Sequence, residues 1–203
     1  AEAITVMNRA RDLGVATPSL LRQLGLSLAE AGQAPEAVPL LEPLADTGDV
    51  EALNALGLVW SEGGDQVRAR QTLSRVFEAD PSNPVTHQVL ALVALRESDW
   101  TAARDEAQRA LGLNSGLPLA WNYLGTALYN LQQPRQALEA WDKALALEPA
   151  NLDVLYNTSI VAMEVGDRER ARRALRAFIA AAPPEELGAD IERAKELLRQ
   201  LGG

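Results

Sequence analysis

The chain has 203 residues, no cysteine and a formal net charge of −9. Without cysteine it has neither disulfides nor thiol chemistry, which suits a cytoplasmic or a periplasmic compartment equally. Its negative charge repels phosphate backbones, so nucleic-acid binding is not expected, and its longest apolar run, residues 89–95, is too short for membrane insertion.

The first predicted element is a short helix over residues 1–13. Ala3, Met7 and Ala10 have helical spacing, and they match in phase the apolar positions of the second helix in hairpins farther along the chain. This indicates half of a helical hairpin, and we expect the chain to be a piece of a longer protein. The alternative interpretation is a lone helix that covers this end of the array.

Five segments follow in which two amphipathic helices are joined by a short turn. In the clearest, apolar residues recur on one face of each helix. They are Trp121, Leu124, Gly125 and Leu128, then Ala137, Trp141, Ala144 and Leu145. The pattern recurs at intervals of 34 residues and once of 32, which predicts hairpins at 18–49, 50–83, 84–117, 118–151 and 152–185. Stacked repeats bury a continuous core that one hairpin alone cannot form.

This spacing resembles the tetratricopeptide repeat, whose pattern is Trp-x2-Leu-Gly-x2-Tyr, then Ala-x3-Phe, then Pro. Trp121, Leu124, Gly125, Ala137 and Pro149 match it directly. The resemblance implies an all-α, right-handed solenoid that forms a single domain over residues 1–203.

Two copies depart from the pattern. The third lacks the closing proline and has Ala107 where the others carry Leu or Trp, so we expect it to have a thinner core. The fifth has Thr158 and Ser159 in place of Leu-Gly. These departures concern local packing only.

The last predicted helix covers residues 186–201, after Pro183 and Pro184. Its apolar stripe consists of Leu187, Ile191, Ala194 and Leu198, with charged residues elsewhere. Such a helix is typical of the polar cap that closes a stacked array.

No residue group in the sequence predicts catalysis, a metal site or a cofactor. His87, the one histidine, takes a packing position in the repeat. Asp65, Asp99 and Asp167 occur at the same place between the two helices of three repeats, where an aspartate caps the second helix. Because these aspartates lie one or more repeats apart, they are not expected to share an ion.

The resemblance implies that the first helix of each hairpin lines a concave groove for peptides or helices of partner proteins. The predicted lining is Asn54, Leu58, Gln88, Leu92, Asn122, Tyr123, Thr126, Tyr129, Tyr156, Asn157, Ile160 and Met163. Amide side chains pair with peptide backbone, and tyrosine offers apolar area with a hydroxyl. All three tyrosines fall in the fourth and fifth repeats, so we expect stronger binding there. The alternative is that these side chains pack between adjacent repeats.

The charges near this groove indicate the kind of partner. Arg22 and Arg96 are its only predicted bases, with Glu30, Glu62 and Glu164 at the rim, so a clamp for acidic C-terminal tails is not expected. A neutral or basic protein or peptide with apolar anchors fits better. The sequence therefore predicts a non-catalytic protein-interaction module. Two alternatives stay open: a regulatory or docking region of a larger bacterial enzyme, and a self-associating scaffold.

Overall fold

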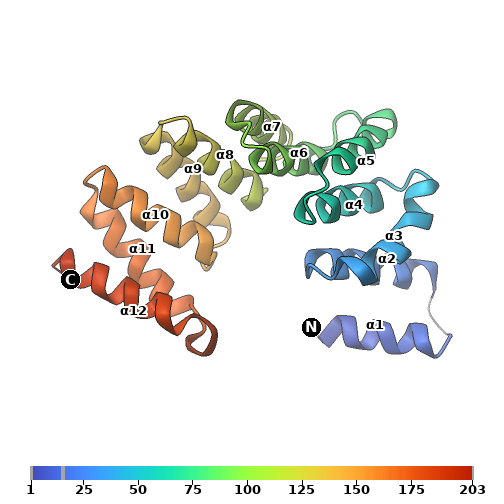
Figure 1. Cartoon of the computed structure of the whole chain (residues 1–203), viewed down its shortest axis with the longest axis horizontal. Coiled ribbons are helices and arrows are strands. Elements are labelled where there is room, and N and C mark those ends of the chain that lie inside the picture. The colour runs from blue at the N-terminus through green and yellow to red at the C-terminus, as the bar shows by residue number, and fades with distance from the viewer. Residues whose placement is uncertain (1, 15–16, 203) are drawn as a thin grey trace. The chain divides into compact units, whose positions relative to one another are not determined.

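The computed structural model describes residues 2–14 and 17–202, and within these ranges it consists of α-helices without a strand (Figure 1). The helices are α1 (Glu2–Asp12), α2 (Pro18–Glu30), α3 (Ala34–Asp46), α4 (Val50–Glu62), α5 (Gln66–Ala79), α6 (Pro84–Arg96), α7 (Trp100–Leu113), α8 (Pro118–Asn130), α9 (Pro134–Leu147), α10 (Leu152–Glu164), α11 (Arg168–Ala181) and α12 (Pro184–Gln200). None of these helices is long and apolar enough to cross a membrane. The predicted all-α class is confirmed.

Consecutive helices pair into hairpins, as the periodicity predicts. The closest pairs are α2 with α3, α4 with α5, α6 with α7, α8 with α9, and α10 with α11 (Figure 1). The turn inside each hairpin needs one residue in the left-handed region, where glycine is least strained. Three hairpins place glycine there, whereas the third and fourth use Ser98 at φ 60° and Gln132 at φ 61°.

The helices gather into two compact units, residues 1–113 and 114–203. Unit 1 holds α1 to α7, and unit 2 holds α8 to α12. Each unit has its own buried core. That all of residues 1–203 form a single domain stays a prediction.

In the first two hairpins of unit 1, a glycine of the first helix faces a leucine of the second helix. A Cβ atom added to Gly57 would lie 2.6 Å from Leu73 Cδ2, so a larger residue at position 57 would require Leu73 to move. Gly25 faces Leu41 in the same way. The third hairpin has alanine at both positions, Ala91 and Ala107, and both are fully buried.

Helix α1 packs against α2 and extends the core of unit 1. Met7 is buried in the core shared with α2 and α3, and Ile4 packs beside it. Val6, in contrast, is 68% exposed. Its equivalents in the second and fourth hairpins, Thr72 and Ala140, are buried. The side chain of Ala3 lies outside the described residues.

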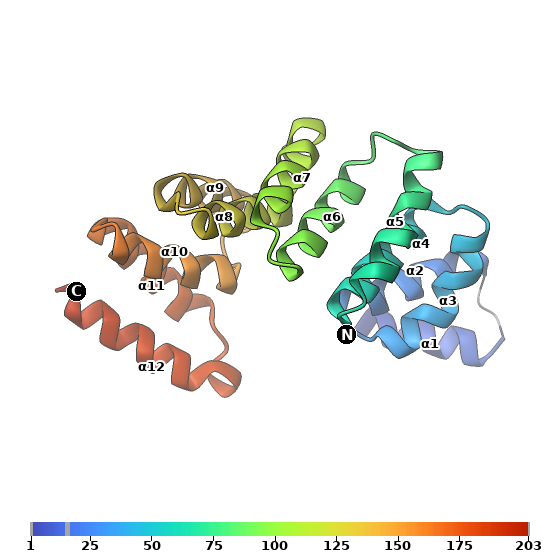
Figure 2. The same cartoon turned by 45° about the horizontal axis from the view of Figure 1, so that its top comes forward.

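The core of unit 2 is organised around Trp141, which is only 2% exposed. A Cβ atom on Gly125 would lie 2.4 Å from Trp141 Nε1, closer than the corresponding contact at Gly25 or Gly57. Helix α12 closes the unit against α11, as Figure 2 shows, with Ile191 and Ala194 buried. Arg172 of α11 donates hydrogen bonds to the carbonyl oxygen of Leu201. The predicted C-terminal capping helix is confirmed.

Candidate protein-binding surface

The three inter-helix aspartates cap the second helix of their hairpins, as predicted. Asp65, Asp99 and Asp167 each accept the backbone N–H three residues later through Oδ1, at 2.9, 3.0 and 3.1 Å. These bonds satisfy N–H groups that have no partner within the helix. The aspartates therefore have a structural role.

His87 packs where the two helices of the third hairpin, α6 and α7, meet. Its Nδ1 lies 2.7 Å from Oε2 of Glu106, and its ring centroid lies 5.3 Å from that of Phe77. This agrees with the packing role predicted from its position. Across residues 2–14 and 17–202, no three histidine, aspartate or glutamate side chains are grouped as metal ligands.

The predicted lining residues of unit 2 lie on two first helices, α8 and α10. We call this set the tyrosine surface: Asn122, Tyr123, Thr126, Tyr129, Tyr156, Asn157, Ile160 and Met163. All eight are half-buried, so each keeps part of its side chain accessible. This exposure is what a binding surface requires, and it also allows packing against the adjacent hairpin.

A hydrogen bond joins the C-terminal ends of α8 and α10 on this surface. The Tyr129 hydroxyl donates to Oε2 of Glu164 at 3.0 Å. This hydrogen bond, together with the Glu164 negative charge and slight burial, raises the pKa of Tyr129 above its ordinary value. Glu164 was predicted at the rim, and the structure adds this contact, which joins residues 35 positions apart.

Aromatic and amide side chains of the tyrosine surface rest directly on the core. The Tyr129 ring centroid lies 6.4 Å from that of Trp141, and Tyr156 lies 6.0 Å from Phe178. Trp141 Nε1 donates to Oδ1 of Asn122 at 3.1 Å, because a buried indole N–H requires an acceptor. These contacts hold the side chains in place with part of each ring accessible.

The predicted lining residues of unit 1 are less accessible. Asn54 is 5% exposed; its amide donates to Asn83 Oδ1 at 3.3 Å and its carbonyl oxygen accepts from Thr86 Oγ1 at 2.8 Å. Leu92 is buried too, whereas Leu58 and Gln88 are half-buried. The amide of Asn54 is therefore used between hairpins, as the packing alternative predicts.

One predicted base near the groove is also engaged. Nη2 of Arg22 lies 2.8 Å from Oδ2 of Asp49, the residue that caps α4. Sequence spacing gave no sign of this pair, because it joins two hairpins. An ion pair that is already formed offers less positive charge to an acidic ligand.

Two family profiles, both described as tetratricopeptide repeat, match residues 22–84 and 118–151. Among curated proteins, the peroxisomal targeting signal receptor of Candida glabrata is 30% identical over 97 residues, which are 48% of this chain and 16% of the receptor. The type IV pilus assembly protein PilF of Pseudomonas aeruginosa is 28% identical over 132 residues, which are 63% of this chain and 52% of PilF. The chain thus spans about half or less of each relative's length.

Solved structures share the fold over most of this chain. TTC0263, a thermophilic TPR protein in Thermus thermophilus, superposes with a TM-score of 0.73 at 18% identity, over 90% of this chain and 99% of that one. MamA MSR-1 gives 0.56 at 26% identity, over 90% and 97%. Tetratricopeptide repeats are protein-interaction scaffolds, and protein–protein interaction is the role they indicate here. The helical hairpins, the glycines packed where their helices cross and these matches identify tetratricopeptide repeats in residues 22–84 and 118–151.

Proposed function

We propose that the chain is a non-catalytic protein-interaction module that binds a segment of a partner protein on the tyrosine surface of α8 and α10. The observation that carries the proposal is the placement of all three tyrosines on these two helices. Tyrosine binds with large area and little loss of rotamer freedom, which makes it frequent in binding surfaces. The relatives' names, a targeting signal receptor and a pilus assembly protein, support an interaction role.

The partner segment that fits this surface is neutral or basic and carries apolar anchors. Ile160 and Met163 supply apolar area, and Asn157 supplies an amide donor and acceptor for peptide backbone. Glu164 places a carboxylate beside Tyr129. A chain of net charge −9 also attracts basic partners over a longer range.

Site-specific photocrosslinking in the source cell tests the proposal. A photoreactive amino acid at position 157 of α10 is expected to crosslink a partner, whereas the same amino acid at position 139, exposed on α9, is not. The result is then checked with the triple variant Tyr123→Ala, Tyr129→Ala and Tyr156→Ala. If this variant is folded by circular dichroism and captures the same partners as wild type, the tyrosine surface is not the binding site.

A second candidate function is self-association through α1. Val6 and Leu13 are 68% and 69% exposed, and they lie seven residues apart, on one side of the helical stretch. Exposed apolar side chains of this size favour burial against a second copy. Light scattering tests this: a particle mass near 21.8 kDa at high protein concentration contradicts it, and Val6→Glu is expected to shift any dimer to monomer. Docking to a larger bacterial enzyme stays a prediction.

A further inference from the structure

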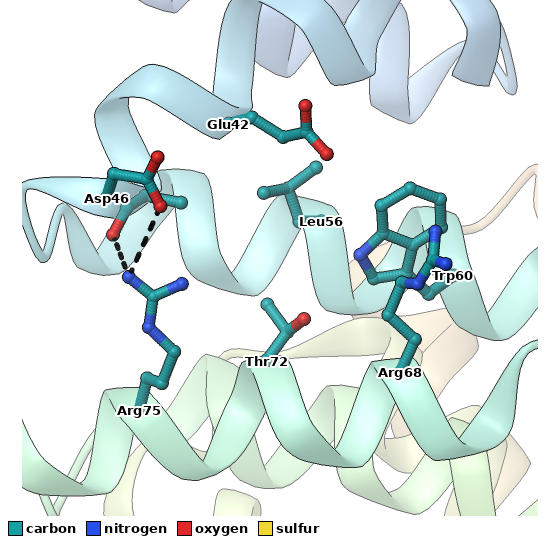
Figure 3. Close-up of a pocket in the computed structure, with 8 residues that line it drawn as sticks. Glu42, Asp46, Leu56, Trp60, Arg68, Thr72 and Arg75 are labelled. Atoms are coloured by element: carbon teal, nitrogen blue, oxygen red, sulfur yellow. Dashed lines mark hydrogen bonds and ion pairs between the residues drawn. The ribbon is translucent and has the colours of Figure 1, made fainter.

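A pocket of about 380 Å³ lies within unit 1, and none of its lining residues belongs to the tyrosine surface (Figure 3). Its walls come from second helices, α3 and α5, and α4 supplies Leu56 and Trp60. The remaining lining residues are Glu42, Ala45, Asp46, Arg68, Thr72 and Arg75. Two of these residues are acidic and two are basic. Which of the four charges already has a partner therefore decides what the pocket binds.

Both arginines of the pocket already have partners. Arg75 Nη2 donates to the carbonyl oxygen of Ala45 at 2.6 Å and lies 3.8 Å from Asp46 Oδ1. The guanidinium carbon of Arg68 lies 4.5 Å from the centroid of the Trp60 ring, and its Nε lies 3.5 Å from Asp65 Oδ2. Each positive charge is therefore accompanied by a carboxylate.

Glu42 differs from these residues, because its carboxylate makes no ion pair or hydrogen bond with any described residue. Figure 3 shows this carboxylate at the pocket, directed toward the space beside Leu56 and Trp60. It is the one charged side chain of the lining that lacks a partner among the side chains that the structure describes. A ligand that adds a positive charge completes the set, whereas an anion adds a second unpaired negative charge.

Unit 2 has an acid and an arginine at the positions equivalent to Glu42 and Arg68, and there the two form an ion pair. The repeat places Asp142 of α9 where α3 has Glu42, and Arg170 of α11 where α5 has Arg68. There, Arg170 Nη2 lies 3.3 Å from Asp142 Oδ2. Its Nε lies 3.4 Å from Asp167 Oδ2 without hydrogen-bond geometry. In unit 2 the guanidinium thus pairs with the acid of the preceding hairpin.

Trp60 explains why unit 1 departs from this arrangement. The equivalent residue in the fifth hairpin is Ala162, which offers no ring to an arginine. In unit 1 the Trp60 indole attracts Arg68 through a cation–π contact, so Arg68 lies on the ring and Glu42 keeps no cation. The ion pair inside unit 2 shows which group suits this acid: a guanidinium.

We propose that the pocket between α3, α4 and α5 binds an arginine side chain of a partner protein, with its guanidinium on the Glu42 carboxylate. A guanidinium donates two parallel hydrogen bonds to a carboxylate. The pocket lies outside the tyrosine surface, so it is a second contact site and stands independently of the proposed function.

Nuclear magnetic resonance titration of the full chain tests the pocket with three small probes. They are the methylamides of Nα-acetyl-arginine, of Nα-acetyl-citrulline, which is its neutral isostere, and of Nα-acetyl-glutamate. The readouts are the indole Nε1–H of Trp60 and the backbone amide of Glu42. The arginine probe is expected to shift both signals, with a dissociation constant in the millimolar range, below about 30 mM.

Three variants give the expected pattern. Glu42→Gln is expected to weaken arginine-probe binding by about twofold to fivefold, the size typical of an exposed ion pair. Glu36→Gln makes the same charge change on α3 outside the pocket and is expected to leave binding unchanged. Arg68→Gln removes a nearby positive charge and uncovers Trp60, so it is expected to tighten binding.

Several results overturn the proposal. One is the absence of any shift at Trp60 with the arginine probe up to about 30 mM. Another is citrulline-probe binding as tight as arginine-probe binding, because the charge then has no part in it. Tighter binding of the glutamate probe makes Arg68 and Arg75 an anion site instead. Equal binding by Glu42→Gln and wild type, both folded, removes Glu42 from the contact.

Discussion

Unit 1 and unit 2 use the same hairpin but connect its surface to its core differently. Asn54 and Asn122 are equivalent residues, one on α4 and the other on α8. Asn54 bonds forward to Thr86 of the next hairpin, whereas Asn122 accepts from Trp141 inside its own hairpin. The same residue type therefore joins two repeats in unit 1 and supports an indole in unit 2.

The cause of this difference is the residue that glycine faces where the two helices of a hairpin cross. In the second hairpin Gly57 faces Leu73, which has no polar side-chain atom, and Asn54 bonds to the neighbouring repeat. In unit 2 glycine faces Trp141, and the buried indole N–H requires an acceptor that Asn122 supplies. One larger core residue thus changes the hydrogen-bond partner of the asparagine at this position of the repeat. Four predictions test this comparison.

The largest effect is expected from Trp141→Ala in unit 2. Removal of this buried ring leaves a cavity and is expected to lower the free energy of unfolding by about 3–5 kcal/mol. Urea denaturation followed by circular dichroism measures the change. Leu147→Ala, on the same helix and 45% exposed, is the control and is expected to cost much less. Equal losses in the two variants contradict a core organised around Trp141.

The next effect concerns the close approach of Gly125 to Trp141. Gly125→Ala places a Cβ atom 2.4 Å from the rigid indole and is expected to cost about 1–3 kcal/mol of stability. The cost is expected to fall when Trp141→Leu is combined with it, because the seam then resembles that of unit 1. Gly188→Ala in α12 meets open space and is expected to stabilise the protein by up to about 1 kcal/mol. A stabilising effect of Gly125→Ala contradicts the close approach of Gly125 to Trp141.

A smaller effect is expected in the hairpin turns. Gln132 has a φ of 61°, and Gly64 fills the equivalent position in unit 1. Gln132→Gly relieves left-handed strain and is expected to stabilise the chain by about 0.5–1 kcal/mol after the entropy cost of glycine. Gly64→Gln is expected to have the opposite sign. The midpoints of thermal unfolding measure both, and equal signs in the two variants contradict the strain argument.

The smallest effect concerns the titration of Tyr129. Its raised pKa means that the folded chain holds this proton more tightly than the unfolded chain. This contribution to stability is therefore complete below the ordinary pKa of 10.0 and is lost as pH rises through the raised value. Glu164→Ala removes both the hydrogen bond and the charge, and it is expected to lower the pKa toward 10.0.

The pKa is measured by following the carbon-13 chemical shifts of the tyrosine rings as pH is raised. The signal that is missing in Tyr129→Phe belongs to Tyr129. The Glu192 carboxylate on α12 is a control from outside the tyrosine surface, since Lys195 donates to it and lowers its pKa. Glu164→Ala is expected to leave the Glu192 titration unchanged. An unchanged Tyr129 midpoint in Glu164→Ala contradicts the contact.

Most of the fold follows from residue spacing, because each helix pair is local in the chain. Apolar residues at helical intervals, prolines at helix starts and aspartates before second helices mark α2 to α11. The hydrogen bonds of Asp65, Asp99 and Asp167 confirm the capping that their position predicts. Local hydrogen bonds depend on neighbours a few residues away, so sequence suffices to place them.

The candidate surface was harder to predict, because residues at the same position of the repeat differ in their exposure. Asn54 and Asn122 have the same place in the repeat, yet one is buried between hairpins and the other is half-buried. The pocket at Glu42 gave no signal in the spacing, since its lining comes from three helices of two hairpins. Whether Arg68 contacts Trp60 or Glu42 depends on which side chains of neighbouring helices lie close to it.

Residue spacing alone specifies the helical hairpins, their repeat and the residues that face each other where the helices cross, since these depend on periodicity and on side-chain size. Contacts between hairpins determine which polar groups bond within the molecule and which remain for a partner. Trp141 takes the oxygen of Asn122, Trp60 takes Arg68, and Glu42 is left unpaired. Hydrogen bonds and ion pairs act over a few ångströms, so they depend on contacts between hairpins that the repeat spacing does not specify.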